Sequence, residues 1–75
     1  MSSDPRADVV CRLDVLLAER DMTLTELSRR TGITMANLSI LKNNKAKAVR
    51  ISTLRALCGV LGVTPGEIFV YGRAE

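Results

Sequence analysis

The residue types that enzymes use for catalysis are scarce in this chain of 75 residues. It has no histidine, no glycine-rich phosphate loop, and no pair of carboxylates placed as in a catalytic cleft. Cys11 and Cys58 have no partner base at a spacing typical of an activated nucleophile. Without a CxxC pair or a histidine they also do not make a metal site, so we expect two free, buried thiols, no cofactor and no enzymatic activity.

No segment approaches the roughly 20 consecutive apolar residues that a membrane span needs. The first residues, Met1 to Ala7, lack the apolar run of a signal peptide. We therefore expect a cytoplasmic protein that does not associate with membranes.

The charges are unevenly distributed along the chain. No acidic residue occurs from Leu27 to Gly66, whereas seven basic residues do. The rest of the chain carries four basic and eight acidic residues, so the net charge of +3 combines a basic middle with acidic ends. Such asymmetry is typical of a protein with an anionic partner, although an ordinary solvated surface would look similar.

The apolar residues along the chain recur with a helical period, and no segment has the pattern of a convincing strand. We expect residues 1–75 to form one all-α domain of five helices, with residues 1–7 as a flexible segment. The apolar spacing of Val9, Val10, Leu13, Leu16 and Leu17 indicates a first helix. We expect it to be capped by Asp4 or Asp8 and to end near Arg20 or Asp21. The expected core consists of Leu13, Leu16, Leu27, Leu38, Leu41, Leu54, Leu57 and Leu61.

The most informative unit is a helix-turn-helix over about residues 23–44. Thr23 and Glu26 have the spacing of a capping box, and the helix that they open should stop at Gly32, where glycine enters the left-handed conformation without steric cost. Thr34 should cap a second helix over about 34–43, closed by an asparagine. Helices joined in this way cross steeply, so the second can enter a DNA major groove.

Two further helices should follow a basic loop at 45–50. Ser52 is the expected cap of a fourth helix that ends at Gly62. The run Thr64-Pro65-Gly66-Glu67 combines a capping box with a proline at the first helical position, so it should open a short last helix to about Val70.

The outer face of the helix at 34–43 is free of acidic residues. At 100° per residue, the side away from Leu38 and Leu41 carries small, polar and apolar residues: Ala36, Ser39, Ile40 and Asn43, flanked by Met35 and Asn37. An ordinary corner between two helices, without a binding role, would not be expected to combine such a face with a basic loop directly after it.

Residues 22–34 and 37–45 resemble the two helices of the phage-repressor-like (Cro-type, xenobiotic-response-element) helix-turn-helix family. The resemblance continues through residues 52–54 and 64–68, and so covers nearly the whole chain. It implies a five-helix domain that binds double-stranded DNA and controls transcription. By position, the residues that it implies for base reading are Met35, Ala36, Asn37 and Ile40. Those expected at the DNA backbone are Thr23, Thr34, Ser39, Lys42, Asn43, Lys45, Lys47 and Arg50.

The chemistry of these side chains fits the implied roles. Asn37 can form two hydrogen bonds with an adenine, while the apolar residues can contact thymine methyl groups. Leu24 stands where family members often have a glutamine that clamps DNA. Lys42 and Leu17 replace a usual Glu–Arg pair, which leaves Lys42 free to approach a phosphate.

A second interpretation is a protein-binding module of the same fold, either antitoxin-like or an adaptor. In that case Met35, Ala36 and Ile40 would form an apolar patch for a partner protein. Binding of RNA or of single strands is disfavoured because such sites stack bases on aromatic residues, and this chain has only Phe69 and Tyr71.

A homodimer is also expected, since a single recognition helix reads only a few base pairs. Phe69, Val70 and Tyr71 form an apolar run in the expected last helix, and consecutive helical residues point in different directions. We therefore expect Val70 and Tyr71 at the dimer interface.

Overall fold

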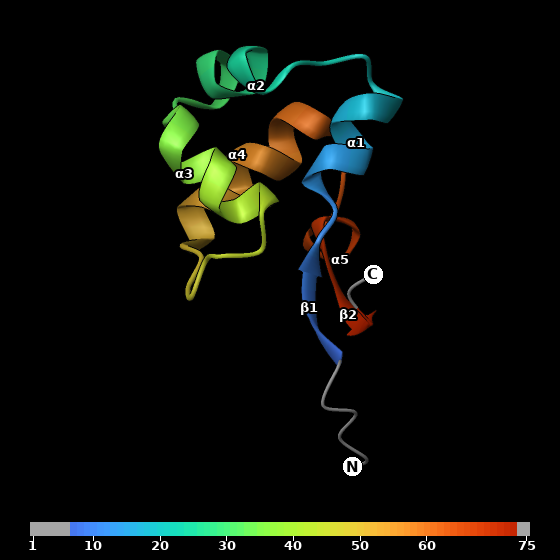
Figure 1. The fold of residues 1–75 in the computed structure, drawn as a ribbon. Coiled ribbons are helices and arrows are strands. Elements are labelled where there is room, and N and C mark those ends of the chain that lie inside the picture. The colour runs from blue at the N-terminus through green and yellow to red at the C-terminus, as the bar shows by residue number, and fades with distance from the viewer. Residues whose placement is uncertain (1–6, 74–75) are drawn as a thin grey trace.

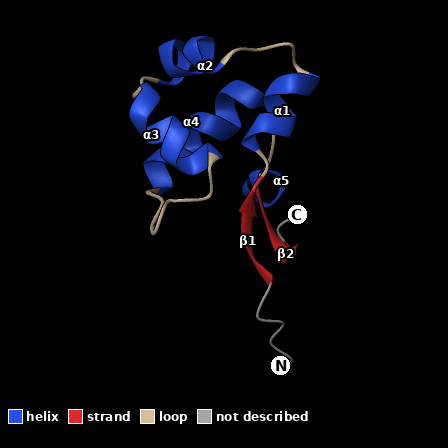
Figure 2. Ribbon diagram, in the orientation of Figure 1, coloured by secondary structure: helices blue, strands red, loops and turns tan. Residues whose placement is uncertain are grey.

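The computed structural model describes the backbone of residues 7–73, and in it five helices are joined to a two-stranded sheet (Figure 1). The elements in chain order are β1 (Ala7–Cys11), α1 (Leu13–Glu19), α2 (Leu24–Thr31), α3 (Met35–Lys42), α4 (Ile51–Leu61), α5 (Pro65–Ile68) and β2 (Phe69–Arg73). The helices form one body, and the sheet extends from it (Figure 2). Most of the flexible segment that was expected at the N-terminus, residues 1–6, lies outside the described residues.

The predicted helix-turn-helix is present with nearly the predicted bounds. The Thr23 hydroxyl accepts the amide of Glu26 at 3.1 Å, and Gly32 ends α2 with a left-handed φ of 77°. The Glu26 carboxylate forms ion pairs with Arg29 and Arg30 on the same helix. The Thr34 hydroxyl accepts the amide of Asn37 at 3.1 Å, so α3 begins where expected.

The predicted start of the fourth helix is wrong by two residues, because the N-cap lies at position 50 and not at Ser52. Helix α4 begins at Ile51, and Arg50 occupies the N-cap position without a capping hydrogen bond from its side chain. A serine at position 52 was therefore not a reliable start signal. Gly62 ends the helix in the left-handed region, as predicted.

The all-α prediction is wrong because the two ends of the described chain pair as antiparallel strands. Val10 lies opposite Val70, and Val9 lies opposite Tyr71. The expected first helix therefore shortens to α1, with neither Asp4 nor Asp8 as its cap, and the expected last helix ends at Ile68. The spacing of the two valines before Leu13 is compatible with a helix. However, β-branched residues also favour strands, and pairing with β2 stabilises the extended conformation.

The core is mainly aliphatic and draws on all five helices and on β1. Its buried residues are Cys11, Leu13, Leu16, Leu17, Leu27, Leu38, Leu41, Leu57, Leu61, Val63 and Ile68. Of the eight predicted leucines only Leu54 is partly exposed, because it lies in the first turn of α4, at the margin of the body. Phe69 packs against the edge of this cluster.

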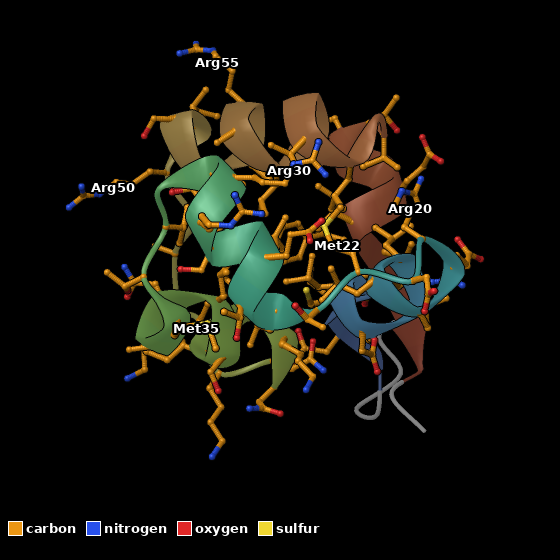
Figure 3. All side chains as sticks on the ribbon, turned by 90° about the horizontal axis from the view of Figure 1, so that it is seen from above. Arg20, Met22, Arg30, Met35, Arg50 and Arg55 are labelled. Carbon is orange, nitrogen blue, oxygen red and sulfur yellow. The ribbon has the colours of Figure 1, made fainter. Side chains whose placement is uncertain are left out.

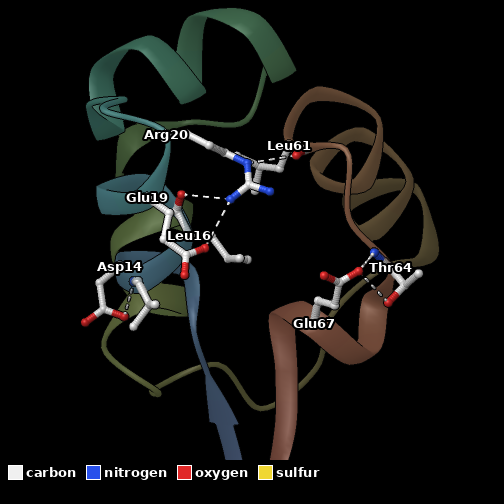
Figure 4. A network of polar contacts seen from close by, with 8 residues as sticks. Asp14, Leu16, Glu19, Arg20, Leu61, Thr64 and Glu67 are labelled. Carbon is white, nitrogen blue, oxygen red and sulfur yellow. Dashed lines mark hydrogen bonds and ion pairs between the residues drawn. The ribbon is translucent and has the colours of Figure 1, made fainter.

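One arginine fastens α1 to the end of α4. The Arg20 guanidinium donates to the carbonyl oxygens of Leu61 at 2.9 Å and of Leu16 at 3.1 Å (Figure 4). It also forms an ion pair with Glu19 at 3.5 Å. Because one planar group serves the carbonyls at two helix ends, it fixes how α1 lies against α4.

Within residues 7–73, no helix is long and apolar enough to cross a membrane.

Candidate nucleic-acid interface

Helix α3 has an inner side that is fixed by two leucines. Leu38 is completely buried and Leu41 nearly so, and both belong to the common core. The side chains on the opposite side must then face solvent, because residues of a helix advance by about 100° each. Packing alone therefore presents one side of this helix to a partner.

The four residues predicted to read bases are all exposed on that side. Met35 is 43% exposed and Ile40 is 44% exposed, and Ala36 and Asn37 are exposed beside them. Asn37 is the one of the four whose side chain can donate and accept hydrogen bonds. The arrangement can therefore offer one polar group amid apolar contacts.

The hydroxyl residues predicted to contact the DNA backbone lie at the start of α2, at the start of α3 and within α3. Thr34 is exposed at the N-cap, while Ser39 is half-buried and accepts a hydrogen bond from the Asn43 amide at 3.3 Å. Thr23 is exposed at the start of α2, where its hydroxyl oxygen accepts the Glu26 amide. Each of these hydroxyl groups still has a hydrogen to donate towards an anion.

Basic side chains surround the exit of α3. Lys42, Lys45, Lys47 and Arg50 are all exposed, and no ion pair occupies them within the described part of the chain. Figure 3 shows Arg50 and Arg55 pointing away from the helical body. These charges are therefore available to an anionic ligand, unlike Arg29 and Arg30, which lie near Glu26.

A family model for the Cro/C1-type helix-turn-helix DNA-binding domain matches residues 12–72. The chain belongs to this family. It is also 60% identical over 67 residues to YozG of Bacillus subtilis (strain 168), a protein named as an uncharacterized HTH-type transcriptional regulator. That match covers 89% of this chain and 80% of YozG. No solved structure matches the chain.

The family assignment confirms the resemblance that the sequence indicated. In this Cro/C1-type domain the structure explains how Leu17 and Lys42 can replace the usual Glu–Arg pair. Leu17 is buried in the core, while Lys42 is exposed at the end of α3. The positive charge that replaces an acid at position 42 therefore adds to the basic surface and does not need an internal partner.

A hollow beside α3 and one exposed isoleucine escaped the sequence analysis. A hollow of about 310 Å³ lies next to α3, and Asn37, Ile40, Arg50 and Thr53 are among its lining residues. Ile51, the first residue of α4, is 68% exposed. An isoleucine at a helix start looks like a core residue in sequence, so only the structure shows that Ile51 is exposed. The structure likewise shows that Thr53 lines the hollow next to α3 in this Cro/C1-type domain.

A long-range contact that also escaped the sequence fixes the exit of α3. Asn44 adopts a positive φ of 60°, as the asparagine closure predicted. Its side-chain oxygen accepts the backbone N–H of Cys11 at 2.6 Å. The loop that carries Lys45 and Lys47 is therefore attached to β1, and no local sequence signal reveals such a pairing across 33 residues.

Neither cysteine is among the residues predicted to contact DNA. Burial raises the pKa of the Cys11 thiol, with a smaller raising effect from the charge of Asp14, so the thiol stays protonated at neutral pH. Cys11 and Cys58 are both free, although Cys58 is half-buried where full burial was expected. No cluster of potential metal ligands occurs among the described residues of the Cro/C1-type domain.

Proposed function

We propose that the chain is a transcriptional regulator that binds double-stranded DNA in a sequence-specific manner, with α3 in the major groove. The observation that carries this proposal is the exposed side of α3, which holds Met35, Ala36, Asn37 and Ile40 and no acid, directly before an unpaired basic loop. The likeness to YozG, which is named as a regulator, supports the regulatory role.

Base reading by this surface would depend on one amide and on methyl contacts. Asn37 is suited to the N6 and N7 edge of adenine, while Met35, Ala36 and Ile40 are suited to the 5-methyl group of thymine. We therefore propose that the preferred half-site is rich in A·T pairs where α3 contacts it.

The surrounding polar groups would hold the phosphates on both sides of the groove. Thr23, Thr34, Ser39 and Asn43 would donate hydrogen bonds, and Lys42, Lys45, Lys47 and Arg50 would add charge. Contacts of this kind set the affinity and the register but carry no sequence information.

We further propose that the whole chain, residues 1–75, acts as one domain and that it binds DNA as a homodimer. One recognition helix contacts only a few base pairs, and two related by a two-fold axis would read half-sites about 34 Å apart on one side of the duplex.

Selection from a pool of random duplexes tests the proposal. We expect an enriched motif rich in A·T pairs, and binding to it that weakens steeply with salt because phosphate contacts release counterions. If the apolar residues of α3 instead bound a partner protein, that binding would be nearly independent of salt. A pool that yields no motif would contradict sequence-specific recognition.

Uracil provides a control for the methyl contacts, because it lacks only the 5-methyl group of thymine. Replacing single thymines of the selected site by uracil should weaken binding at one or more positions, while the slope of affinity against salt stays the same. If every such duplex binds as well as the original, the apolar residues of α3 do not read methyl groups.

A further inference from the structure

A second hollow lies between the sheet and the basic loop. It has a volume of about 380 Å³, and its lining comes from β1, the end of α3, residues 46–49 and the start of β2. We call it the sheet-side hollow. Ala46, Ala48 and Val49 line both this hollow and the one next to α3, so the two hollows share the loop as a wall. A volume of this size lies at the lower end of the range for sites that hold small molecules.

Part of the lining of the sheet-side hollow is apolar. Leu41 is nearly fully buried, and Phe69 and Val49 are half-buried around it. Phe69 is the one phenylalanine of the chain, and its ring can contact an apolar group across a flat surface. The hollow therefore offers apolar contact to the body of a small ligand.

The β1 side of the hollow carries hydrogen-bond acceptors and a negative charge. The N–H of Cys11 donates to the Asn44 side chain, and the N–H of Val9 donates to the Asp8 carboxylate at 2.7 Å. Asp8 is exposed, and a carboxylate that accepts one hydrogen bond can still accept others. This side of the hollow is therefore suited to a cationic group such as an ammonium.

The loop side of the hollow carries the opposite charge. Lys47 is exposed and lines the hollow, and among the described residues no ion pair joins it to Asp8. Asn44 lies beside it and still has an amide NH2 group that can donate. This side of the hollow is therefore suited to an anionic group such as a carboxylate.

From this arrangement we infer that the sheet-side hollow binds a small zwitterion with an apolar body, which is the chemistry of a free apolar amino acid. The ammonium group of the ligand lies against Asp8, and its carboxylate lies against Lys47 and the Asn44 amide. Its side chain packs against Phe69 and Val49. Hydrogen bonds between charged groups are roughly twice as strong as neutral ones, so both charges of the ligand contribute.

Binding in this hollow should weaken binding to DNA, and this part of the inference rests on the proposed function. Lys47 is one of the residues proposed to contact a phosphate, so the carboxylate of the ligand competes with DNA for the same ammonium group. Coupling between two binding sites is reciprocal and typically changes an affinity by about 5–150-fold. We expect a saturating ligand to weaken the affinity for a duplex about tenfold.

Titration of the DNA-free protein followed by NMR tests the binding site. The probes are L-phenylalanine, L-leucine and L-methionine, and at least one should shift the backbone amides of Asp8, Asn44 and Lys47. The absence of such shifts with all three up to about 10 mM would overturn the inference.

Two analogues of L-phenylalanine test whether both charges are recognised. 3-Phenylpropanoic acid lacks the ammonium group, and 2-phenylethylamine lacks the carboxylate. We expect each to bind about tenfold more weakly than L-phenylalanine, because each loses one charge-assisted contact. Equal binding of all three compounds would mean that the hollow recognises only the apolar body, and the zwitterion would be the wrong ligand class.

Asp8→Asn provides the decisive variant, and Asp14→Asn is its matched control. Each of these exposed carboxylates accepts the N–H of the next residue, but only Asp8 lines the hollow. We expect Asp8→Asn to bind L-phenylalanine about tenfold more weakly, whereas Asp14→Asn binds it as the original does. Equal affinities of the two folded variants would overturn the role of Asp8.

The affinity for a selected duplex, measured with and without the amino acid, tests the coupling separately. The ratio of the two affinities should be about ten for the original and for Asp14→Asn, and close to one for Asp8→Asn at the same concentration. An amino acid that binds without changing the affinity for DNA would overturn the competition for Lys47. A chain that binds no duplex would refute the proposed function, while the NMR titration would still decide whether the hollow is a ligand site.

Discussion

Loss of the Asn37 side chain should alter the specificity for DNA sequence more clearly than loss of any other side chain on α3. It is exposed at the second residue after Met35 on α3, and its amide can bond two atoms of one base. We expect Asn37→Ala to relax the preference at one base pair, with a cost of about 1–3 kcal/mol for the preferred site. Affinities for the four variants of each base pair measure this, and Asn43→Ala serves as the control. A loss that is the same for all sequences would make Asn37 a backbone contact.

The basic residues of the loop at 45–50 should affect the affinity for every duplex and not the sequence preference. Lys45, Lys47 and Arg50 are exposed, so each is free to neutralise a phosphate. Substitution of each by alanine should weaken binding to every duplex and reduce the slope of log affinity against log salt by about one. Arg12→Ala, in which an exposed arginine outside this loop is lost, is the control. A changed sequence preference with an intact slope would contradict the phosphate role.

The exposure of single residues on α3 was predictable because a helix repeats regularly. Once Leu38 and Leu41 were taken as the buried side, the exposure of Met35, Asn37 and Ile40 followed from the angle between residues. The position of Ile51 and the bond from Cys11 to Asn44 did not follow, because each depends on segments that are far apart in sequence.

At the level of the helix, Leu38 holds α3 against the core. It is completely buried, whereas Ile40 on the same helix is 44% exposed. Leu38→Ala should lower the free energy of unfolding by about 2–5 kcal/mol through lost burial and an added cavity. Ile40→Ala should change it far less, so the pair of variants separates folding from DNA contact. Denaturant unfolding provides the measurement, and comparable losses would show that α3 is oriented differently.

Helix α5 should make the stability of the domain sensitive to acid. The Thr64 backbone N–H donates to the Glu67 carboxylate at 2.9 Å, which holds the pKa of that carboxyl below its usual value (Figure 4). A lowered pKa in the folded state adds stability above the ordinary carboxyl range, and this stability disappears as the pH falls through the lowered pKa. Glu67→Gln should therefore be less stable than the original at neutral pH and equally stable in strong acid. Unfolding midpoints across this range measure it, and a difference that does not vary with pH would refute the role of the charge.

The element boundaries show where sequence patterns suffice. Caps that act within one turn, such as Thr34 and Gly32, were located correctly because the side chain and the backbone that it serves are neighbours. The strands were missed because Val9 and Val10 gain their conformation from Tyr71 and Val70, about 60 residues later, and a pairing over that distance leaves no local period.

Across the whole molecule, Asn44 connects the basic loop at 45–50 to the sheet. Asn44→Gly keeps the positive φ but removes the bond to the Cys11 amide, whereas Asn44→Ala loses both. We expect Asn44→Gly to cost about 1 kcal/mol of folding stability and Asn44→Ala to cost more. Thermal unfolding and exchange of the Cys11 amide check this. If both variants matched the original, the bond would not contribute to the fold.

The pairing of Ala7 with Arg73 places the first and last described residues opposite each other at the tip of the sheet. The two ends of the described chain therefore leave the fold side by side, at the tip of the sheet that extends from the helical body (Figure 2). We expect a tag or domain fused at either end to leave folding and binding to a single half-site unchanged. Comparing tagged and cleaved protein on a duplex with one half-site would check this.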